Sequence, residues 1–240
     1  METELDLFKF KQFESEIILL TIRWYLKYSL SYRNLVEMME ERGLHMAHTT
    51  IMRWVHQFGP ELGKRIRPYL KSTNDSFRTD ETYVKVKGQW KYLYRAVDSS
   101  GNTIDFMLSE NRDIHAAKRF FKKAMASPHN PSPRVITVDK NPAYPTAVQQ
   151  LKEEKAMKQE TLLRQQKYLN NIIEQDHRFI KKIIKPMLGF KSFKTAEKTI
   201  AGIEAMHMIR KGQVEYTHSS ALSDVILIAT GLIPRSLLRN

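Results

Sequence analysis

The chain of 240 residues contains no cysteine. This absence excludes disulfides, cysteine-based zinc sites and thiol catalysis. The chain also lacks a long hydrophobic run, because its longest apolar stretch, residues 225–229, is far too short to span a bilayer. The first residues, METELDLFKF, are acidic and contain no hydrophobic core of a signal peptide. We therefore expect a cytoplasmic protein without a membrane partner.

Zinc coordination by histidine is not indicated either. The chain has eight histidines, but it has no HExxH sequence and no helical histidine pair at metal-binding spacing. We expect His177 and His207 to lie at the surface or to face a nucleic acid.

Positive charge is in clear excess, and it is unevenly distributed. The formal net charge of +13 and the pI of about 9.8 predict a polyanionic partner, nucleic acid rather than a membrane surface. Residues 73–213 hold 26 Lys and Arg against 15 Asp and Glu, a net of +11, whereas residues 1–72 hold 11 against 9. Affinity for a nucleic-acid backbone should therefore come mainly from the middle of the chain.

Residues 1–60 are typical of a small helical domain. Helices are predicted at about 14–28, 32–42 and 48–58, with Ser31 as the N-cap of the second helix and Gly43 as its stop. A helix, a short glycine-containing turn and another helix form the helix-turn-helix pattern. It predicts that the third helix enters a major groove with these polar side chains: His48, Thr49, Thr50, Arg53 and Gln57. A plain three-helix bundle is the alternative.

After a linker at residues 61–76, the pattern changes to β-strands. Three antiparallel strands are predicted at 77–86, 89–98 and 103–109, separated by the turn signals KG and SSGN. A helix at 114–126, a short strand at 134–138 and further helices at 172–184 and 195–210 follow, while residues 155–168 are ambiguous. These elements predict an α/β domain over residues 77–213, with a mixed sheet covered by helices. Residues 214–240 form a tail of unknown role.

Two aspartates stand where such a sheet would hold a ligand. Asp80 lies inside a strand-like run, where aspartate is uncommon. Asp139 directly follows the apolar strand residues 135–138, at the end where α/β folds bind their ligands. On position alone, each could equally be a solvated surface or turn residue.

A third carboxylate comes from the predicted helix 172–184. On a helical wheel, the face opposite the isoleucines carries Glu174, Arg178, Lys181 and Lys185. This face presents a carboxylate together with cations, although an ordinary surface pair of Glu174 and Arg178 would give the same pattern. Asp176 falls on the apolar arc, where it needs a buried partner, and it is the rival third carboxylate.

Metal binding would explain why three separated acids converge. Asp80, Asp139 and Glu174 would repel one another unless a cation lay between them. Mg²⁺ prefers oxygen ligands and combines few carboxylates with substrate phosphates. Two such ions, about 4 Å apart, can drive in-line displacement at a phosphodiester. The sequence therefore predicts phosphoryl chemistry on nucleic acid with two Mg²⁺ ions, Mn²⁺ being the alternative metal.

Longer motifs carry a family resemblance. DETYVKVKGQWKYLYRAVD, VDKNPAY and YLNNIIEQDHRFIK closely resemble the acidic motifs of bacterial insertion-sequence transposases of the DDE type, in particular family six. The resemblance extends from about residue 31 to residue 213. The intervals of 58 and 34 residues between the three acids agree with that family. So does a basic residue seven positions after the glutamate, Lys181.

The resemblance implies an RNase H-like catalytic core preceded by a helix-turn-helix domain. It implies a DNA transposase that binds terminal inverted repeats, cleaves the element ends and joins them to target DNA by Mg²⁺-dependent strand transfer. Such enzymes act as homo-oligomers and commonly form cointegrates. Asp80, Asp139 and Glu174 would hold the metals and Lys181 would contact the terminal DNA, with Arg178 and Lys185 as further DNA contacts. The alternatives are an RNase H-like nuclease without joining activity and a helix-turn-helix regulator without catalysis.

Overall fold

The protein is described by a computed structural model that covers residue 8, residues 11–166 and residues 171–215. The described chain forms two compact units. One unit consists of residues 71–181, and the other combines the residues up to 70 with those from 182 onward. The tail predicted at 214–240 lies almost entirely outside the described residues.

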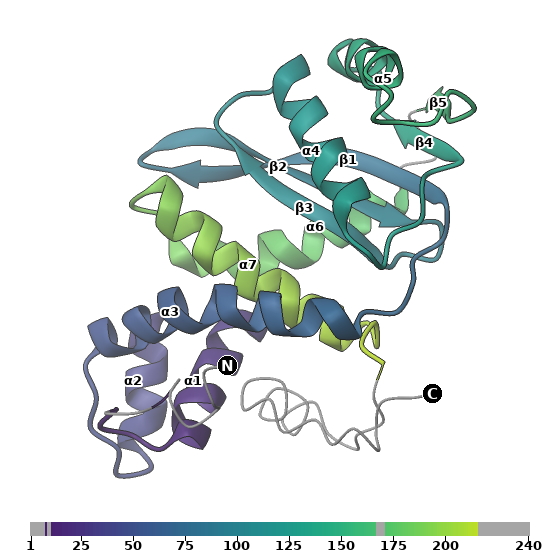
Figure 1. The fold of residues 1–240 in the computed structure, drawn as a ribbon. Coiled ribbons are helices and arrows are strands. Elements are labelled where there is room, and N and C mark those ends of the chain that lie inside the picture. Colours follow the sequence, from purple (N-terminus) through teal and green to yellow (C-terminus); the bar gives the residue numbers. More distant parts are fainter. Residues whose placement is uncertain (1–7, 9–10, 167–170, 216–240) are drawn as a thin grey trace. The chain divides into compact units, whose positions relative to one another are not determined.

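A five-stranded mixed sheet is the centre of the first unit (Figure 1). Its strands are β1 (Ser76–Val86), β2 (Gln89–Asp98), β3 (Thr103–Ser109), β4 (Val135–Val138) and β5 (Leu162–Gln165), in the order β3-β2-β1-β4-β5. The first three strands are antiparallel, whereas β4 runs parallel to β1 and β5 parallel to β4. This topology confirms the predicted RNase H-like mixed sheet. β5 lies in the stretch that the sequence left ambiguous.

The β1–β2 hairpin turns at two residues with positive φ, Lys87 and Gly88. Two-residue hairpin loops favour this conformation because its twist matches that of the flanking strands. The KG signal in the sequence therefore fixes the register of the hairpin, in which Asp80 lies opposite Arg95.

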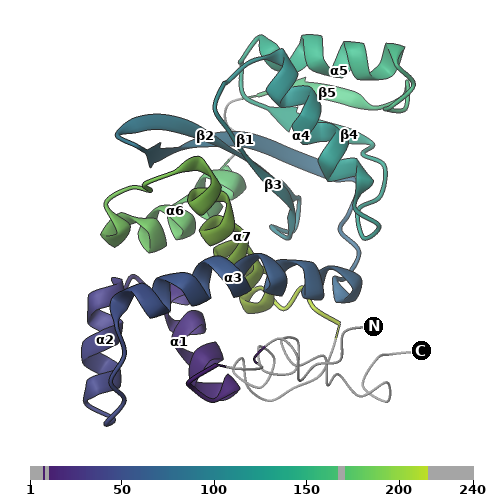
Figure 2. The same ribbon diagram turned by 60° about the vertical axis from the view of Figure 1, so that its left-hand side comes forward.

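Helices cover both faces of the sheet (Figure 2). α4 (Ile114–Ala126) and α5 (Ala143–Glu153) pack on one face, and α6 (Asn171–Ile184) lies on the other. The core under α4 and α5 joins Phe77 and Ile136 of the sheet to Phe120, Phe121 and Tyr144 of the helices. β4 is buried at all four positions, as expected for a central parallel strand.

The other unit is helical and contains α1 (Ser15–Lys27), α2 (Tyr32–Glu40), α3 (His48–Ile66) and α7 (Phe193–Arg210). Ser31 caps α2 as predicted, in a capping box with Asn34. Gly43 has φ +71°, and its amide and that of Leu44 donate to the carbonyls of Glu40 and Met39. This is a Schellman motif, so the predicted glycine stop is also confirmed.

The predicted end of the third helix at residue 58 is wrong, because α3 continues to Ile66. Pro60 removes one helical hydrogen bond but does not end the helix. The continuation buries Leu62 and Ile66. α7 packs alongside α3, and Gly59 and Gly202 allow the close approach. The structure thus groups α7 with the N-terminal helices and not with the sheet.

Candidate metal centre

The register of the sheet brings Asp80 and Asp139 together. β1 pairs with β4 in parallel, and the last paired residues are Arg78 and Thr137. Asp80 and Asp139 each lie two residues further along the chain, so they stand at the same level, Asp80 inside β1 and Asp139 directly after β4. The 59-residue offset of the two acids therefore equals the offset of the paired strands. Two carboxylates predicted from separate motifs converge here.

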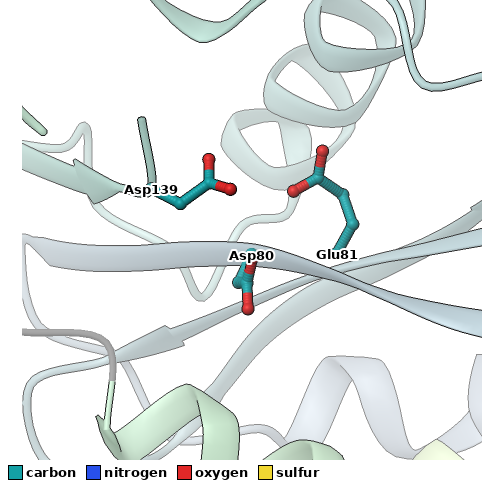
Figure 3. A group of neighbouring side chains, drawn as sticks. All are labelled: Asp80, Glu81 and Asp139. Atoms are coloured by element: carbon teal, nitrogen blue, oxygen red, sulfur yellow. The ribbon is translucent and has the colours of Figure 1, made fainter. Parts of the chain in front are cut away.

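Glu81 joins these two aspartates, which the sequence did not predict. Ligand oxygens of Asp80, Glu81 and Asp139 all lie within 4.8 Å of one another. Figure 3 shows Glu81 and Asp139 on one side of β1 and Asp80 on the other, as the alternation along a strand requires. The signal was present in the DET motif, but an adjacent acid on a strand points to the opposite face and is easily discounted.

Arg112 bridges two of the three acids. Its Nε donates to Oε1 of Glu81 at 2.9 Å, and its Nη2 donates to Oδ2 of Asp139 at 3.0 Å. Asn141 also binds both acids. Its side-chain Nδ2 donates to Oε1 of Glu81 at 3.1 Å, and its backbone N–H donates to Oδ1 of Asp139 at 3.0 Å. Glu81 is buried, with only 3% of its side chain exposed. Glu81 and Asp139 are therefore fixed in place by hydrogen bonds.

Asp80 is the electrostatically strained member of the group. Burial, together with the charges of Glu81 and Asp139, raises the pKa of Asp80 from 3.8 to about 7. A backbone hydrogen bond at Glu81 and the charge of Arg112 oppose this rise. A nearby divalent cation would relieve the repulsion between the carboxylates. The donors are all carboxylate oxygens, which suit a hard cation such as Mg²⁺.

α6 is anchored to the sheet next to Asp80. Oδ2 of Asp176 lies 2.6 Å from Nη2 of Arg95, whose side chain is completely buried. Arg95 is the buried partner that the wheel position of Asp176 demands. One residue later, Nδ1 of His177 lies 3.8 Å from Oδ2 of Asp80. α6 therefore carries two consecutive residues that contact the strands of the site.

The surface positions predicted for His177 and His207 are wrong, because both side chains are buried. Burial, the charge of Arg95 and that of Lys181 lower the pKa of His177 to about 3. The imidazole is neutral at physiological pH, so its contact with Asp80 is not an ion pair.

Glu174 lies in the first turn of α6, one helical turn before His177, and it is exposed. Among the described residues, the group of three carboxylates within 4.8 Å contains Glu81 and does not contain Glu174. Lys181 follows one turn after His177 and is also exposed. The remaining predicted cations of this helix region, Arg178 and Lys185, are exposed as well.

The residues predicted to read a major groove lie on α3. His48, Arg53 and Gln57 are exposed, while Thr49 and Thr50 are half-buried. Nζ of Lys11 donates to Oε1 of Gln57 at 3.1 Å. Lys11, Gln12 and Phe13 line a shallow pocket together with Thr50, Arg53, Trp54 and Gln57. The segment before α1 therefore contacts part of this surface.

Comparison with known proteins identifies the family of the chain. A protein-family model described as a DDE domain matches residues 74–213, a range that contains Asp80, Glu81, Asp139, Glu174 and Asp176. Together with the strand order, this match defines a DDE-type enzyme with an RNase H-like core.

Two curated relatives narrow the family. The transposase for insertion sequence-like element IS431mec of Staphylococcus aureus is 40% identical over 207 residues, which cover 86% of this chain and 90% of that protein. The transposase for insertion sequence element IS257 in transposon Tn4003, also from Staphylococcus aureus, is 39% identical over the same share of both chains. The chain belongs to the DDE transposases of insertion-sequence family six.

Solved structures show more distant likenesses. The HTLV-2 integrase catalytic core domain in complex with magnesium aligns with a TM-score of 0.43 and 13% identity, over 56% of this chain and 86% of that one. A simian T-cell lymphotropic virus intasome, in complex with a PP2A regulatory subunit, aligns with a TM-score of 0.45 and 12% identity, over 81% and 70%. Within the described ranges, no helix combines the length with the hydrophobicity that crossing a membrane requires.

Proposed function

We propose that this transposase binds the terminal inverted repeats of its element, cleaves the element ends and joins them to target DNA in a reaction that depends on Mg²⁺. The observation that carries the proposal is the convergence of Asp80, inside β1, with Asp139, directly after the paired strand β4. Buried Arg95 and Asp176 support it, since they hold α6 beside this pair of aspartates.

Asp80, Asp139 and Glu174 are proposed to hold two divalent ions. His177 of α6 contacts Asp80. Glu174 lies one helical turn before His177, in the first turn of the same helix, and this supports its assignment as the third ligand. The ions, when bound, would activate a water or a terminal 3′-OH and stabilise the leaving oxygen of the phosphodiester. Glu81 is better suited to position Arg112 and Asn141, because its Oε1 accepts from both.

Arg112 is proposed to neutralise and orient Asp139 before the metal binds. In this structure its guanidinium neutralises Asp139 through one hydrogen bond and Glu81 through another. Asp139 would hold the metal, while Arg112 would keep its hydrogen bond to Glu81 and could bind a DNA phosphate. Lys181, with Arg178 and Lys185, is proposed to contact the terminal DNA from α6 and the residue that follows it.

Repeat recognition is assigned to the N-terminal helices. We propose a helix-turn-helix domain at about 1–60, a connection at 61–76 and a catalytic core at 77–213. The helix α3 extends into this connection as far as Ile66, and α7 of the proposed core is grouped with the N-terminal helices. α3 would enter the major groove with His48, Thr49, Thr50, Arg53 and Gln57. The capped α2 and the glycine-stopped turn before α3 support this assignment. The protein would act as a homo-oligomer on paired ends and form cointegrates.

The test combines purified protein, Mg²⁺, labelled inverted-repeat DNA and a plasmid target. The proposal expects nicked and joined products, both lost in Asp139→Ala while DNA binding persists. Unchanged products from Asp139→Ala would refute the metal site. Cleavage without joining would indicate a nuclease, and binding without cleavage a regulator. Arg53→Ala provides the complementary arm, because it should weaken binding to repeat DNA more than binding to unrelated duplex.

A further inference from the structure

An aromatic row leads from the carboxylates to the tip of the β1–β2 hairpin and has no role in the proposed chemistry. Three cross-strand pairs form it: Glu81 with Tyr94, Tyr83 with Tyr92, and Lys85 with Trp90. Paired residues, and residues two apart on a strand, share one face of a sheet. Glu81 therefore stands at one end of a continuous face and Trp90 at the other.

Exposure increases steadily along this face. Tyr94 is fully buried, Tyr92 is half-buried, Tyr83 is 49% exposed and Trp90 is 62% exposed. The Tyr83 and Trp90 rings are nearly perpendicular, at 79° with centroids 6.3 Å apart. A perpendicular pair cannot cover the flat faces of both rings, so part of this aromatic surface is open. Contiguous exposed aromatic surface of this kind marks a binding site.

Positive charge predominates at the exposed end of this face. Between Glu81 and Asp98 the chain has no acidic residue. Lys85, which pairs with Trp90 on this face, and Lys87 in the turn are both exposed. Aromatic rings among cations bind single-stranded nucleic acid, because bases stack on the rings while the lysines bind the phosphates. A second copy of the chain fits less well, since an isologous contact would bring the same lysines together.

We propose that the aromatic hairpin, residues 83–92, binds unpaired nucleotides of DNA beside the carboxylate site. A base stacks on Trp90 and Tyr83, and Lys85 and Lys87 bind the adjacent phosphates. The inference rests on the proposed function, because it supplies a place for the strand that is separated at an element end. It adds a binding surface outside α3 and α6.

The test uses the full chain and two labelled probes without divalent metal: oligo-dT of about 20 nucleotides and a duplex of the same length. Trp90→Ala should lower the affinity for oligo-dT about tenfold and change the affinity for duplex less than about twofold, because only unpaired bases can stack on it. Trp90→Phe should restore most of the lost affinity. Leu162→Ala is the matched control, since it removes an exposed apolar side chain from β5 of the same sheet. Fluorescence anisotropy measures all four proteins.

Three results would overturn the inference. Trp90→Ala could leave both affinities unchanged, or it could lower both equally, which would indicate a general loss of structure. It could also reduce the oligomer mass in light scattering, which would assign the hairpin to a protein contact. The joining assay separates this inference from the proposed function. If the protein joins DNA and Trp90→Ala binds oligo-dT as tightly as wild type, only the proposed hairpin site is refuted. If binding to oligo-dT depends on Trp90 but the protein does not join DNA, only the proposed transfer activity is refuted.

Discussion

Arg95 and Asp176 form an ion pair of 2.6 Å between β2 and α6, and the Arg95 side chain is completely buried. Arg95 lies directly opposite Asp80 in the β1–β2 pairing. The same α6 places His177 against Asp80. The buried pair thus holds α6 beside Asp80, which favours a structural role for Asp176 over a ligand role.

The first prediction concerns Asp176→Asn. Removing one partner of a buried ion pair exposes the other charge to a low-dielectric interior, so we expect the free energy of unfolding to fall by about 3 kcal/mol. Glu174→Gln should change it by less than about 0.5 kcal/mol, because Glu174 is exposed. Urea denaturation measures both. At a temperature where Asp176→Asn stays folded, it should join DNA ends far better than Glu174→Gln, and the reverse order would make Asp176 the third ligand.

The second prediction decides between the two glutamates. Glu174→Gln should reduce strand transfer about 100-fold or more, because a lost metal ligand removes stabilisation of the transition state. Glu81→Gln should keep at least about a tenth of the activity, since the amide oxygen can still accept from Arg112 and Asn141. Joining rates at saturating Mg²⁺ are compared. A larger loss in Glu81→Gln would identify the cluster of Asp80, Glu81 and Asp139 as the complete ligand set.

The third prediction follows from the raised pKa of Asp80. In the metal-free protein, folding opposes ionisation of this carboxyl until about pH 7, whereas the unfolded chain ionises near pH 3.8. Wild-type stability should therefore fall as the pH rises from about 4 to about 7, and Asp80→Asn should avoid this loss. The variant should gain about 1–3 kcal/mol relative to wild type above pH 7.

Thermal or urea unfolding in EDTA across this pH range measures the difference between the two proteins. Mg²⁺ at pH 8 should stabilise wild type more than Asp80→Asn, since the ion binds only to the ionised group. A stability difference that stays constant with pH would show that Asp80 has an ordinary pKa.

The sequence predicted the strands of the site better than its contacts. The KG turn and the apolar run before Asp139 were enough to place Asp80 on a hairpin strand and Asp139 at a strand end, because these elements depend on local signals. The parallel pairing of β1 with β4 joins segments 59 residues apart and was not predicted. Arg112 could not be predicted in the same way, since it lies in a loop and reaches Glu81 and Asp139 only through the tertiary fold. The burial of His177 was missed because the wheel shows which residues share a face, not how far a neighbouring sheet covers it.

The last prediction addresses the packing of α7 on α3. A Cβ added at Gly202 would lie 2.7 Å from Cδ1 of Leu26 and 3.0 Å from the Cα of Gly59. Gly202→Ala should therefore force the helices apart and cost about 2–3 kcal/mol of unfolding free energy, more than the gain in helix propensity. Gly63→Ala is the control, because its Cβ would meet only the carbonyl oxygen of Ala201 at 3.6 Å, an ordinary contact. Urea denaturation should show that Gly63→Ala is as stable as wild type or slightly more stable. Equal losses of unfolding free energy in both variants would contradict a close α3–α7 contact at Gly202.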